Sequence, residues 1–413
     1  MMEDPKMSED KSTKELVSKV GRRRRQHEIP EDLVKNEELN AIKAASLPWN
    51  YAFEVEKTLW RLRRAKAKKV ALQLPEGLLM YGNALGEILK KFQGCRVIVL
   101  GDATYGACCV DDITARGLGA DFLVHYGHSC LVPAPITTLP MLYVFVDIQF
   151  DPDHLVRCLE TSELFKAKKK KIALLATVQF LSGLRIAARA FGSDEVVVPQ
   201  ESPLSGGEVL GCTSPKLEDV EALVFVSDGR FHLESAMIKN PSIPAYRYDP
   251  YAKSLSREYY DYKEMTRRRQ AAVDDAKRVL RTRKPKVGIV LGTLGRQGSP
   301  QILKRLKNLL RHQNITQILT ILASELDSDL LASFGDDIDL WIQIACPRLS
   351  IDWGHNYLPN SKPVLSPYEA FALFEETSEE TSEETSSDWA TNEDYPMDFY
   401  SKKGGPWSNY YKE

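Results

Sequence analysis

Short runs of aliphatic and β-branched residues recur along the chain, and the pattern restarts at intervals of about a hundred residues. The first run of each unit covers residues 68–74, 170–176 and 285–291, and each opens with a Lys-Lys or Pro-Lys pair. Runs that are almost continuously apolar are typical of strands buried on both faces of a parallel sheet. The pattern therefore predicts a repeat of whole α/β units, because the period is longer than that of solenoid motifs.

Each unit contains three further runs, so the pattern predicts four strands per unit. The second runs are residues 96–100, 195–198 and 317–322, the third are 121–126, 222–226 and 339–344, and the fourth are 142–146, 245–248 and 363–365. Helical segments separate the first two strands at residues 81–92, 183–191 and 299–312, and another helix is predicted at 53–65. Alternation of strand, helix and strand favours right-handed crossovers and a parallel sheet.

We therefore predict an α/β fold of three tandem lobes, each a small, mostly parallel sheet with flanking helices, arranged with pseudo-threefold symmetry. The expected lobes cover residues 48–165, 166–283 and 284–374. Residues 1–47 are predicted to form a weakly ordered N-terminal tail. Residues 375–413 are predicted to form an acidic linker and an aromatic C-terminal tail, because the linker is of low complexity and cannot bury a core.

The roles of the two tails stay open. The basic run from Arg22 to Arg25 suits either a solvated tail or a signal for localisation or for an acidic partner. Aromatic residues at 395–400 and 406–407 follow the acidic stretch 375–388. These aromatics would either dock on the body or on a partner, or they would belong to an unstructured tail.

Composition narrows the class of protein. The net charge is −2 in 413 residues, which gives no overall argument for nucleic acid or a membrane surface. No apolar run approaches the roughly 20 residues needed to span a bilayer. The seven cysteines are too sparse for a disulfide scaffold, and their number is odd. We expect a reducing compartment, the cytosol or the nucleus, with thiols free to bind metal.

Three cysteines occupy comparable places in the three units. Cys108 and Cys212 follow the second predicted strand of their units, and Cys346 ends the third predicted strand of the last unit. Ligands of α/β sheets bind outside the carboxyl ends of strands. Three lobes could therefore aim all three thiols at one place, and three thiolates with one open coordination position suit catalysis more than structure.

Two other interpretations of these cysteines stay open. Each could be a small buried hydrophobe, which is the commonest fate of a free cysteine. Zinc is the other alternative, although zinc usually draws on a Cys-x-x-Cys pair or a histidine, and the chain has no such pair. The remaining cysteines suit packing, and the side chain of Cys109 is expected to point away from that of Cys108. They are Cys95, Cys109, Cys130 and Cys158.

Two further pairs of side chains are candidates for lining a cavity where the three thiols meet. Asp111 and Asp112 follow Cys108, and His125 and His128 stand at the end of the third strand. The two histidines could ligate metal, but we expect one to be packed and the other to line the pocket.

A glycine-rich turn follows the first strand of the third unit. It covers residues 292–298, and such a turn presents backbone N–H groups to a carboxylate or phosphate. The spacing differs from a dinucleotide fingerprint, so a purely structural turn is the alternative. The candidate cofactor-binding residues are Gly292, Gly295, Gln297 and Gly298.

Several motifs resemble the diphthamide synthesis family, and in particular its eukaryotic subunit 1 branch. The resemblance covers about residues 47–373. The motifs are Tyr-Gly-Ala-Cys-Cys-Val-Asp-Asp at 105–112, Val-His-Tyr-Gly-His-Ser-Cys at 124–130, Gly-Glu-Val-Leu-Gly-Cys at 207–212, Gly-Thr-Leu-Gly-Arg-Gln-Gly at 292–298 and Ala-Cys-Pro-Arg-Leu-Ser-Ile-Asp-Trp at 345–353.

The resemblance implies a [4Fe–4S] cluster held by Cys108, Cys212 and Cys346. It also implies transfer of a 3-amino-3-carboxypropyl group from S-adenosylmethionine to a histidine of translation elongation factor 2, by radical chemistry without the compact Cys-x-x-x-Cys-x-x-Cys loop of ordinary radical enzymes. The implied partners are a related subunit 2, forming a heterodimer, and a small iron-binding electron donor. A non-catalytic scaffold subunit that bears a cluster or zinc is the alternative.

Overall fold

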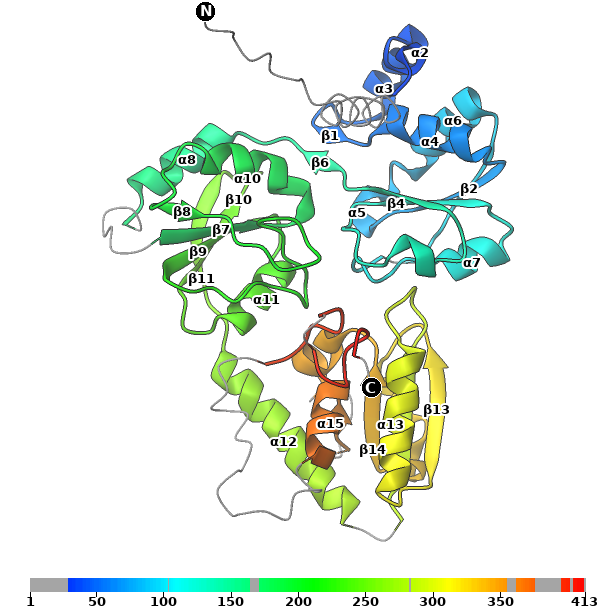
Figure 1. The fold of residues 1–413 in the computed structure, drawn as a ribbon, viewed down its shortest axis with the longest axis vertical. Helices are drawn as coiled ribbons and strands as arrows, with labels where there is room; N and C mark the ends of the chain where they lie inside the picture. The colour runs from blue at the N-terminus through cyan, green and yellow to red at the C-terminus, as the bar shows by residue number, and fades with distance from the viewer. Residues whose placement is uncertain are drawn as a thin grey trace, which may run out of the picture.

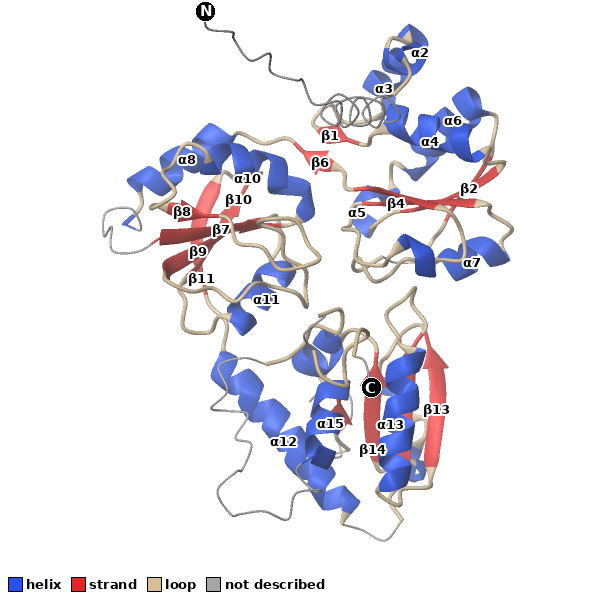
Figure 2. Ribbon diagram, viewed as in Figure 1, coloured by secondary structure: helices blue, strands red, loops and turns tan. Residues whose placement is uncertain are grey.

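Three sheets formed by successive parts of the chain dominate the described residues of the computed structural model (Figure 1). The structure describes residues 29–102, 104–163, 171–281, 284–354, 362–375, 395–401 and 404–411. The fold is mixed α/β, with mostly parallel strands and helices against the sheets (Figure 2). No helix within the described ranges combines the length and the apolar character needed to cross a membrane.

The first sheet is fully parallel, with the order β3-β2-β4-β5. Its strands are β2 (Lys69–Gln73), β3 (Arg96–Val99), β4 (Phe122–Tyr126) and β5 (Met141–Val144). Its helices are α4 (Val55–Ala65), α5 (Glu76–Leu79), α6 (Gly82–Gln93) and α7 (Asp112–Gly117).

The second sheet repeats this order and adds one antiparallel edge strand, giving β11-β10-β9-β7-β8. Its strands are β7 (Lys171–Ala176), β8 (Val196–Val197), β9 (Val220–Val226), β10 (Ala245–Asp249) and β11 (Ser254–Glu258). Its helices are α8 (Pro152–Thr161), α10 (Leu181–Ala188) and α11 (Phe231–Lys239). A short antiparallel pair, β1 (Tyr51–Ala52) with β6 (Asp147–Ile148), precedes it.

The third sheet has the same parallel order, β13-β12-β14-β15. Its strands are β12 (Val287–Gly292), β13 (Ile318–Ala323), β14 (Leu340–Ile344) and β15 (Val364–Leu365). Its helices are α12 (Tyr262–Leu280), α13 (Pro300–His312), α14 (Ser328–Ala332) and α15 (Pro367–Glu375).

Helix α13 shows how local sequence sets these elements. The side chain of Ser299 accepts a hydrogen bond from the N–H of Ile302, and Pro300 occupies the first turn, where no N–H partner is needed. Ile302, Leu306 and Leu310 recur at helical spacing and are fully buried. Their stripe packs α13 into the core of the third sheet.

Every strand predicted from the hydrophobic runs is present, with ends shifted by a few residues, and so are the four predicted helices.

The prediction that residues 1–47 are weakly ordered is wrong for the last part of that segment. Residues 31–34 and 37–46 form the helices α2 (Glu31–Val34) and α3 (Glu37–Ser46), and their Leu33 and Leu39 are fully buried in the first core. Their many charged neighbours obscured these two leucines in the sequence. The run from Arg22 to Arg25 lies outside the described residues.

The predicted lobe boundaries at 165/166 and 283/284 stay a prediction. Packing associates the helix before each boundary with the sheet that follows it. Leu155 and Leu159 of α8 belong to the core beneath the second sheet, and Val273 and Ala276 of α12 belong to the core of the third. These two helices therefore contribute apolar contacts across the predicted boundaries.

Candidate metal centre

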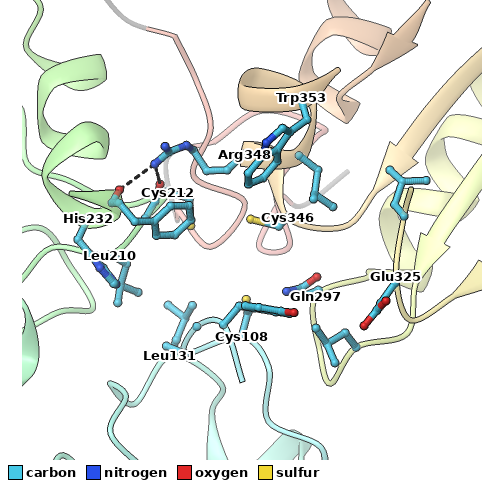
Figure 3. Close-up of a pocket in the computed structure, with 18 of the residues that line it drawn as sticks. Cys108, Leu131, Leu210, Cys212, His232, Gln297, Glu325, Cys346, Arg348 and Trp353 are labelled. Atoms are coloured by element: carbon cyan, nitrogen blue, oxygen red, sulfur yellow. Dashed lines mark hydrogen bonds between the residues drawn. The ribbon is translucent and has the colours of Figure 1, made fainter. Parts of the chain in front are cut away.

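Loops from all three sheets surround a cavity of about 370 Å³, and each loop contributes one of the three candidate cysteines. Cys108 follows β3, Cys212 lies between β8 and β9, and Cys346 follows β14. Figure 3 shows these side chains around one space, attached to three different ribbons. The fold therefore brings together three thiols that are far apart in the sequence.

A buried glutamine at the end of β2 holds the Cys108 loop. The Nε2 of Gln73 donates to the carbonyl oxygen of Cys109 at 2.7 Å, and its Oε1 accepts from the N–H of Asp111 at 3.1 Å. The Nδ1 of His125 lies 2.8 Å from the same Oε1. Because a buried amide needs its hydrogen bonds satisfied, Gln73 constrains the backbone directly after Cys108.

A second buried glutamine holds the Cys346 turn. The Nε2 of Gln343, near the end of β14, donates to the carbonyl oxygen of Cys346 at 3.1 Å and to the Oγ of Ser350 at 2.9 Å. Its Oε1 accepts from the N–H of Ala345 at 2.9 Å. The chain then continues as a π-helical turn, Leu349–Trp353. The first and third sheets thus use the same side-chain chemistry to hold their cysteine loops.

The Cys212 loop is held by backbone pairing instead. The N–H of Val209 donates to the carbonyl oxygen of Ala176, the last residue of β7, at 3.1 Å. A Cβ added at Gly211 would lie 2.1 Å from the ring of Phe231. Glycine therefore lets this loop pack closely on an aromatic ring that also lines the cavity.

Arg296 connects the Cys108 loop to the third sheet. Its backbone N–H donates to the carbonyl oxygen of Cys108 at 2.8 Å, and its guanidinium donates to both carboxylate oxygens of buried Asp112 at 2.8 and 2.7 Å. Burial alone would raise the pKa of Asp112, but the hydrogen bonds from Arg296 and Thr138 and the charge of Arg296 together outweigh it and lower that pKa. A Cβ at Gly295, whose φ is +56°, would lie 2.3 Å from the carbonyl carbon of Cys109, so this approach requires glycine.

Arg348 connects the Cys212 loop to the third sheet. Its Nη1 donates to the carbonyl oxygens of Gly211 at 3.3 Å and Phe231 at 2.8 Å, as the dashed lines in Figure 3 mark. Its Nη2 donates to Glu234 at 2.5 Å, and its Nε donates to Asp352 at 3.0 Å. The guanidinium also stacks over the Phe231 ring at 4.4 Å. One buried side chain thus fastens two cysteine loops to each other.

The three thiols are hard to ionise in this setting. The pKa of Cys108 is raised well above its ordinary value by its hydrogen bond with Cys109, by burial and by the neighbouring thiols of Cys346 and Cys212. Burial also raises the pKa of Cys212, and it raises that of Cys346 to about 11. Because metals bind thiolates, a bound cation would displace these protons and compensate the buried charge.

Three thiols around one cavity are ligand atoms of the kind that iron–sulfur clusters and zinc use. Thiolates favour zinc or iron–sulfur clusters, and tetrahedral zinc brings its ligand atoms within about 4 Å of one another. In the described part of the chain, no group of three His, Cys, Asp or Glu side chains could hold a metal ion as it stands. The three cysteines instead surround a cavity.

The remaining wall of the cavity combines apolar side chains with a few polar ones. The apolar residues include Leu131, Leu210, Phe231, Leu294 and Leu349, and the polar ones include His232, Gln297, Glu325, Asp327 and Arg348. Burial lowers the pKa of His232 to about 4, so its imidazole is uncharged at neutral pH. The wall therefore places both apolar surface and hydrogen-bonding groups beside the thiols.

Of the glycine-rich turn, Gln297 lines the cavity, as does the intervening Leu294. The three glycines instead permit close packing. A Cβ at Gly292 would lie 2.7 Å from the Cβ of Ala345, and one at Gly298 would lie 2.1 Å from the carbonyl oxygen of Gly292. Gly295 packs against the Cys109 backbone. Their role in cofactor binding stays a prediction.

The prediction that Cys109 points away from Cys108 is wrong. Its buried side chain is hydrogen-bonded to that of Cys108, and its sulfur accepts from the Nε2 of Gln297 at 3.2 Å. The bond with Cys108 comes first among the causes that lower the pKa of Cys109 to about 7. A turn closed by the N–H of Cys109 on the carbonyl oxygen of Gly106 replaces the extended backbone in which neighbouring side chains diverge.

The acidic pair and the histidine pair do not line the cavity. Asp112 is paired with Arg296, and the carboxylate of Asp111 caps α7. His125 is fully buried, which confirms that one histidine is packed. His128 is also buried, with its ring 5.4 Å from that of His125, so the expectation that it lines the pocket is wrong.

Sequence reasoning missed His232 and Arg348 as residues of the cavity wall. Arg348 lies within the motif around Cys346, and an arginine two residues after a candidate ligand was a usable signal. His232 follows a bend before α11 and has no motif around it. Its position depends on how the second sheet meets the other two.

The chain matches the family model of diphthamide synthesis proteins over residues 74–385. Three similar proteins are each named 2-(3-amino-3-carboxypropyl)histidine synthase subunit 1. The one from Dictyostelium discoideum is 48% identical, covering 93% of this chain and 78% of the relative. The one from Gallus gallus is 50% identical, covering 94% and 89%, and the one from Homo sapiens is 48% identical, covering 92% and 82%.

Two solved structures share the fold. The crystal structure of Dph2 from Pyrococcus horikoshii has a TM-score of 0.62 at 27% identity, covering 80% of this chain and 92% of that one. The structure of Dph2 from Pyrococcus horikoshii with a 4Fe-4S cluster has a TM-score of 0.63 at 26% identity, with the same coverage. The chain therefore shares its mixed α/β fold, with several mostly parallel sheets, with a protein that has been solved with a 4Fe-4S cluster.

Proposed function

The chain belongs to the diphthamide synthesis protein family, and from that premise we propose that it performs the first step of diphthamide synthesis. In this step a 3-amino-3-carboxypropyl group passes from S-adenosylmethionine to a histidine of translation elongation factor 2. The name of the relatives contains this group and the histidine, and a synthase of this kind is a transferase. The donor, the acceptor protein and the radical chemistry are parts of the proposal.

The observation that carries the proposal is the meeting of Cys108, Cys212 and Cys346 around one cavity. We propose that these residues hold a [4Fe–4S] cluster, which agrees with the cluster in the Pyrococcus horikoshii structure. The equal strand order of the three sheets supports the further proposal that the lobes are related by a pseudo-threefold axis. Such an axis would pass between the three thiols.

When bound, such a cluster supplies an electron and one iron without a cysteine ligand, which is open to a substrate. The residues of the chain prepare the space around it. Buried Leu131 and Leu210 make part of its wall apolar. Glu325 and Asp327 lie on the part of the cavity wall that the third sheet contributes. Their carboxylates favour a cationic substrate such as a sulfonium.

His232 and Gln297 are the polar groups that we assign to orienting the reactants. The uncharged ring of His232 can accept a hydrogen bond from an incoming imidazole, since burial keeps it neutral. The amide of Gln297 is fixed by its bond to Cys109 and borders the same space. Which carbon of S-adenosylmethionine reacts would depend on the shape of this wall.

The proposal includes two protein partners and a location. The relatives are named as subunit 1, which implies a complex with another subunit. We propose that this is the related subunit 2 in a heterodimer, and that a small iron-binding protein delivers electrons. We also keep the cytosol, with the nucleus as a second site, as the proposed location.

The decisive experiment uses anaerobically purified full-length chain together with its partner subunit. Iron, sulfide and absorbance near 400 nm (roughly, for iron–sulfur charge transfer) are measured first. S-adenosylmethionine, a strong reductant and elongation factor 2 are then added. We expect the factor to gain one 3-amino-3-carboxypropyl group on histidine, with methylthioadenosine as the small product, because cleavage on the amino acid side leaves methyl and adenosyl on sulfur.

Other outcomes would identify a different function. Methionine and 5′-deoxyadenosine without modified factor would show that the wrong carbon–sulfur bond breaks. A colourless protein with one zinc and no sulfide would support the zinc-binding scaffold. If this subunit binds a cluster but the complex stays active after that cluster has been removed, the result would support the non-catalytic scaffold.

A further inference from the structure

The C-terminal segment, residues 395–401 and 404–411, folds back onto the body of the protein. Tyr395, Met397 and Phe399 are each only 4% exposed, and the side chain of Ser408 is buried. Figure 1 shows this red segment where the three sheets approach one another. Of the two alternatives for the aromatic tail, the structure therefore shows docking on the body.

One part of the segment is anchored to the third sheet. The hydroxyl of Tyr395 donates to the carboxylate of Glu369 at 2.6 Å, and Glu369 is also paired with buried Arg269 at 2.6 Å. The Nη2 of Arg305, on α13, donates to the carbonyl oxygen of Ser408 at 2.6 Å. These bonds to buried or partly buried charged groups fix both ends of the segment.

The middle of the segment packs between the first two cysteine loops. Phe399 and Tyr400 form an apolar cluster with side chains from both loops, and Cys108 packs against this cluster. The other members are Ala107 and Leu131 from the first lobe, and Leu204 and Leu210 from the second. Leu131 and Leu210 also line the cavity, so the segment supports the outer side of its wall.

Two polar contacts connect the segment to residues that adjoin or contact the candidate ligands. The hydroxyl of Tyr400 donates to the carbonyl oxygen of Arg296 at 2.9 Å, and the N–H of Arg296 donates to the carbonyl oxygen of Cys108 at 2.8 Å. The carboxylate of Asp398 is hydrogen-bonded to the side chain of Thr213, which adjoins Cys212. One short segment therefore contacts the neighbours of two candidate ligands from different sheets.

We propose that the C-terminal segment is a positioning strap, which holds the Cys108 and Cys212 loops at cluster-binding separation and shields the cluster from solvent. This proposal rests on the proposed cluster at the three cysteines. Phe399 and Tyr400 act through the loops that they press together, so they are positioning residues. Without them the wall behind Leu131 and Leu210 would lose its packing, and water would reach the thiols.

The test measures how fast iron leaves the loaded protein under anaerobic conditions. A ferrous chelator, bathophenanthroline disulfonate, is added to the purified complex, and its coloured iron complex is followed over time. We expect a chain that ends at residue 394 to release iron roughly tenfold faster than the full chain, as loss of about 1.4 kcal/mol of packing would give. A peptide of residues 395–411 added in trans should restore slow release.

Point variants keep the test valid if the shortened chain folds poorly. Phe399→Ala should accelerate release roughly tenfold, and Tyr400→Phe, which loses only the bond to Arg296, roughly threefold. Tyr410→Phe is the matched control, because Tyr410 lies in the same segment and is 38% exposed. Its release rate should equal that of the wild type.

Two results would overturn the proposal, and they are distinguishable. Release at the wild-type rate from both the shortened chain and Phe399→Ala, with full loading, would overturn the strap alone. A wild-type protein without iron or sulfide would overturn the proposed cluster and the strap with it. A shifted charge-transfer spectrum in Phe399→Ala, reversed by the peptide, would support positioning over general stability.

Discussion

Two arginines connect the cysteine loops of the first two sheets to the third sheet, and they do so by different kinds of hydrogen bond. The Arg348 side chain is 1% exposed and makes every bond to the Cys212 loop through its guanidinium. The Arg296 side chain is 26% exposed, and its direct bond to Cys108 comes from the backbone N–H. The connection of the Cys212 loop to the third sheet therefore depends on one side chain, whereas that of the Cys108 loop depends on backbone geometry around Gly295.

The largest expected effect tests the premise of this comparison, that the three thiols form one site. Single substitution of Cys108, Cys212 or Cys346 by Ala should remove most of the iron from the anaerobically purified protein, since a cluster needs all its thiolates. Iron and sulfide analysis is the measurement. Cys95→Ala and Cys158→Ala serve as controls and should load normally. Full loading of one ligand variant would exclude that residue from the site.

Arg348→Met should have the next largest effect. It leaves Glu234 and Asp352 without their common partner and frees the carbonyl oxygens of Gly211, in the Cys212 loop, and of Phe231. Because those carboxylates are partly exposed, we expect a loss of about 3 kcal/mol, at the lower end for a broken buried pair. Urea unfolding measures stability, and iron analysis measures loading. An unchanged iron content would show that Arg348 does not position Cys212.

Gly295→Ala should disturb the Cys108 loop by a steric route. Its Cβ would meet the Cys109 backbone, and φ at this residue is +56°, so we expect a loss of about 2 kcal/mol together with reduced iron loading. Gly335→Ala is a matched control, because φ there is +43° and no atom lies within 4 Å of the added Cβ. Equal effects of the two substitutions would mean that backbone strain alone is responsible.

Arg296→Gln should have the smallest effect of the series on iron loading. The backbone bond to Cys108 remains, and the N–H of Thr138 still donates to the carboxylate of Asp112. We expect near-normal iron loading but a loss of about 3 kcal/mol in stability, because the fully buried carboxylate of Asp112 loses its cation. Urea unfolding and iron analysis of Arg296→Gln and Arg348→Met, measured side by side, test this prediction. If Arg296→Gln loses as much iron as Arg348→Met, the two arginines act alike and the comparison fails.

The site could be predicted in part because its ligands share a topological position. Cys108, Cys212 and Cys346 follow recognisable strands, and the carboxyl ends of parallel strands are where ligands bind. Cys109 was misplaced because a local turn, which the pattern does not reveal, decides where its side chain points. His232 was missed because nothing near it in the sequence indicates the neighbouring sheets.

By itself, the sequence determined the local elements of this protein. Strands such as β2, β7 and β12 follow from apolar runs whose burial is favoured in any sheet, and α13 follows from a capping serine and an apolar stripe. Only the tertiary structure decided that Gln73 and Gln343 hold the thiol loops, that two arginines join three sheets, and that Phe399 and Tyr400 pack behind the cavity wall. The physical reason is range: strand and helix propensities act between near neighbours, whereas these hydrogen bonds and contacts form only after the sheets have met.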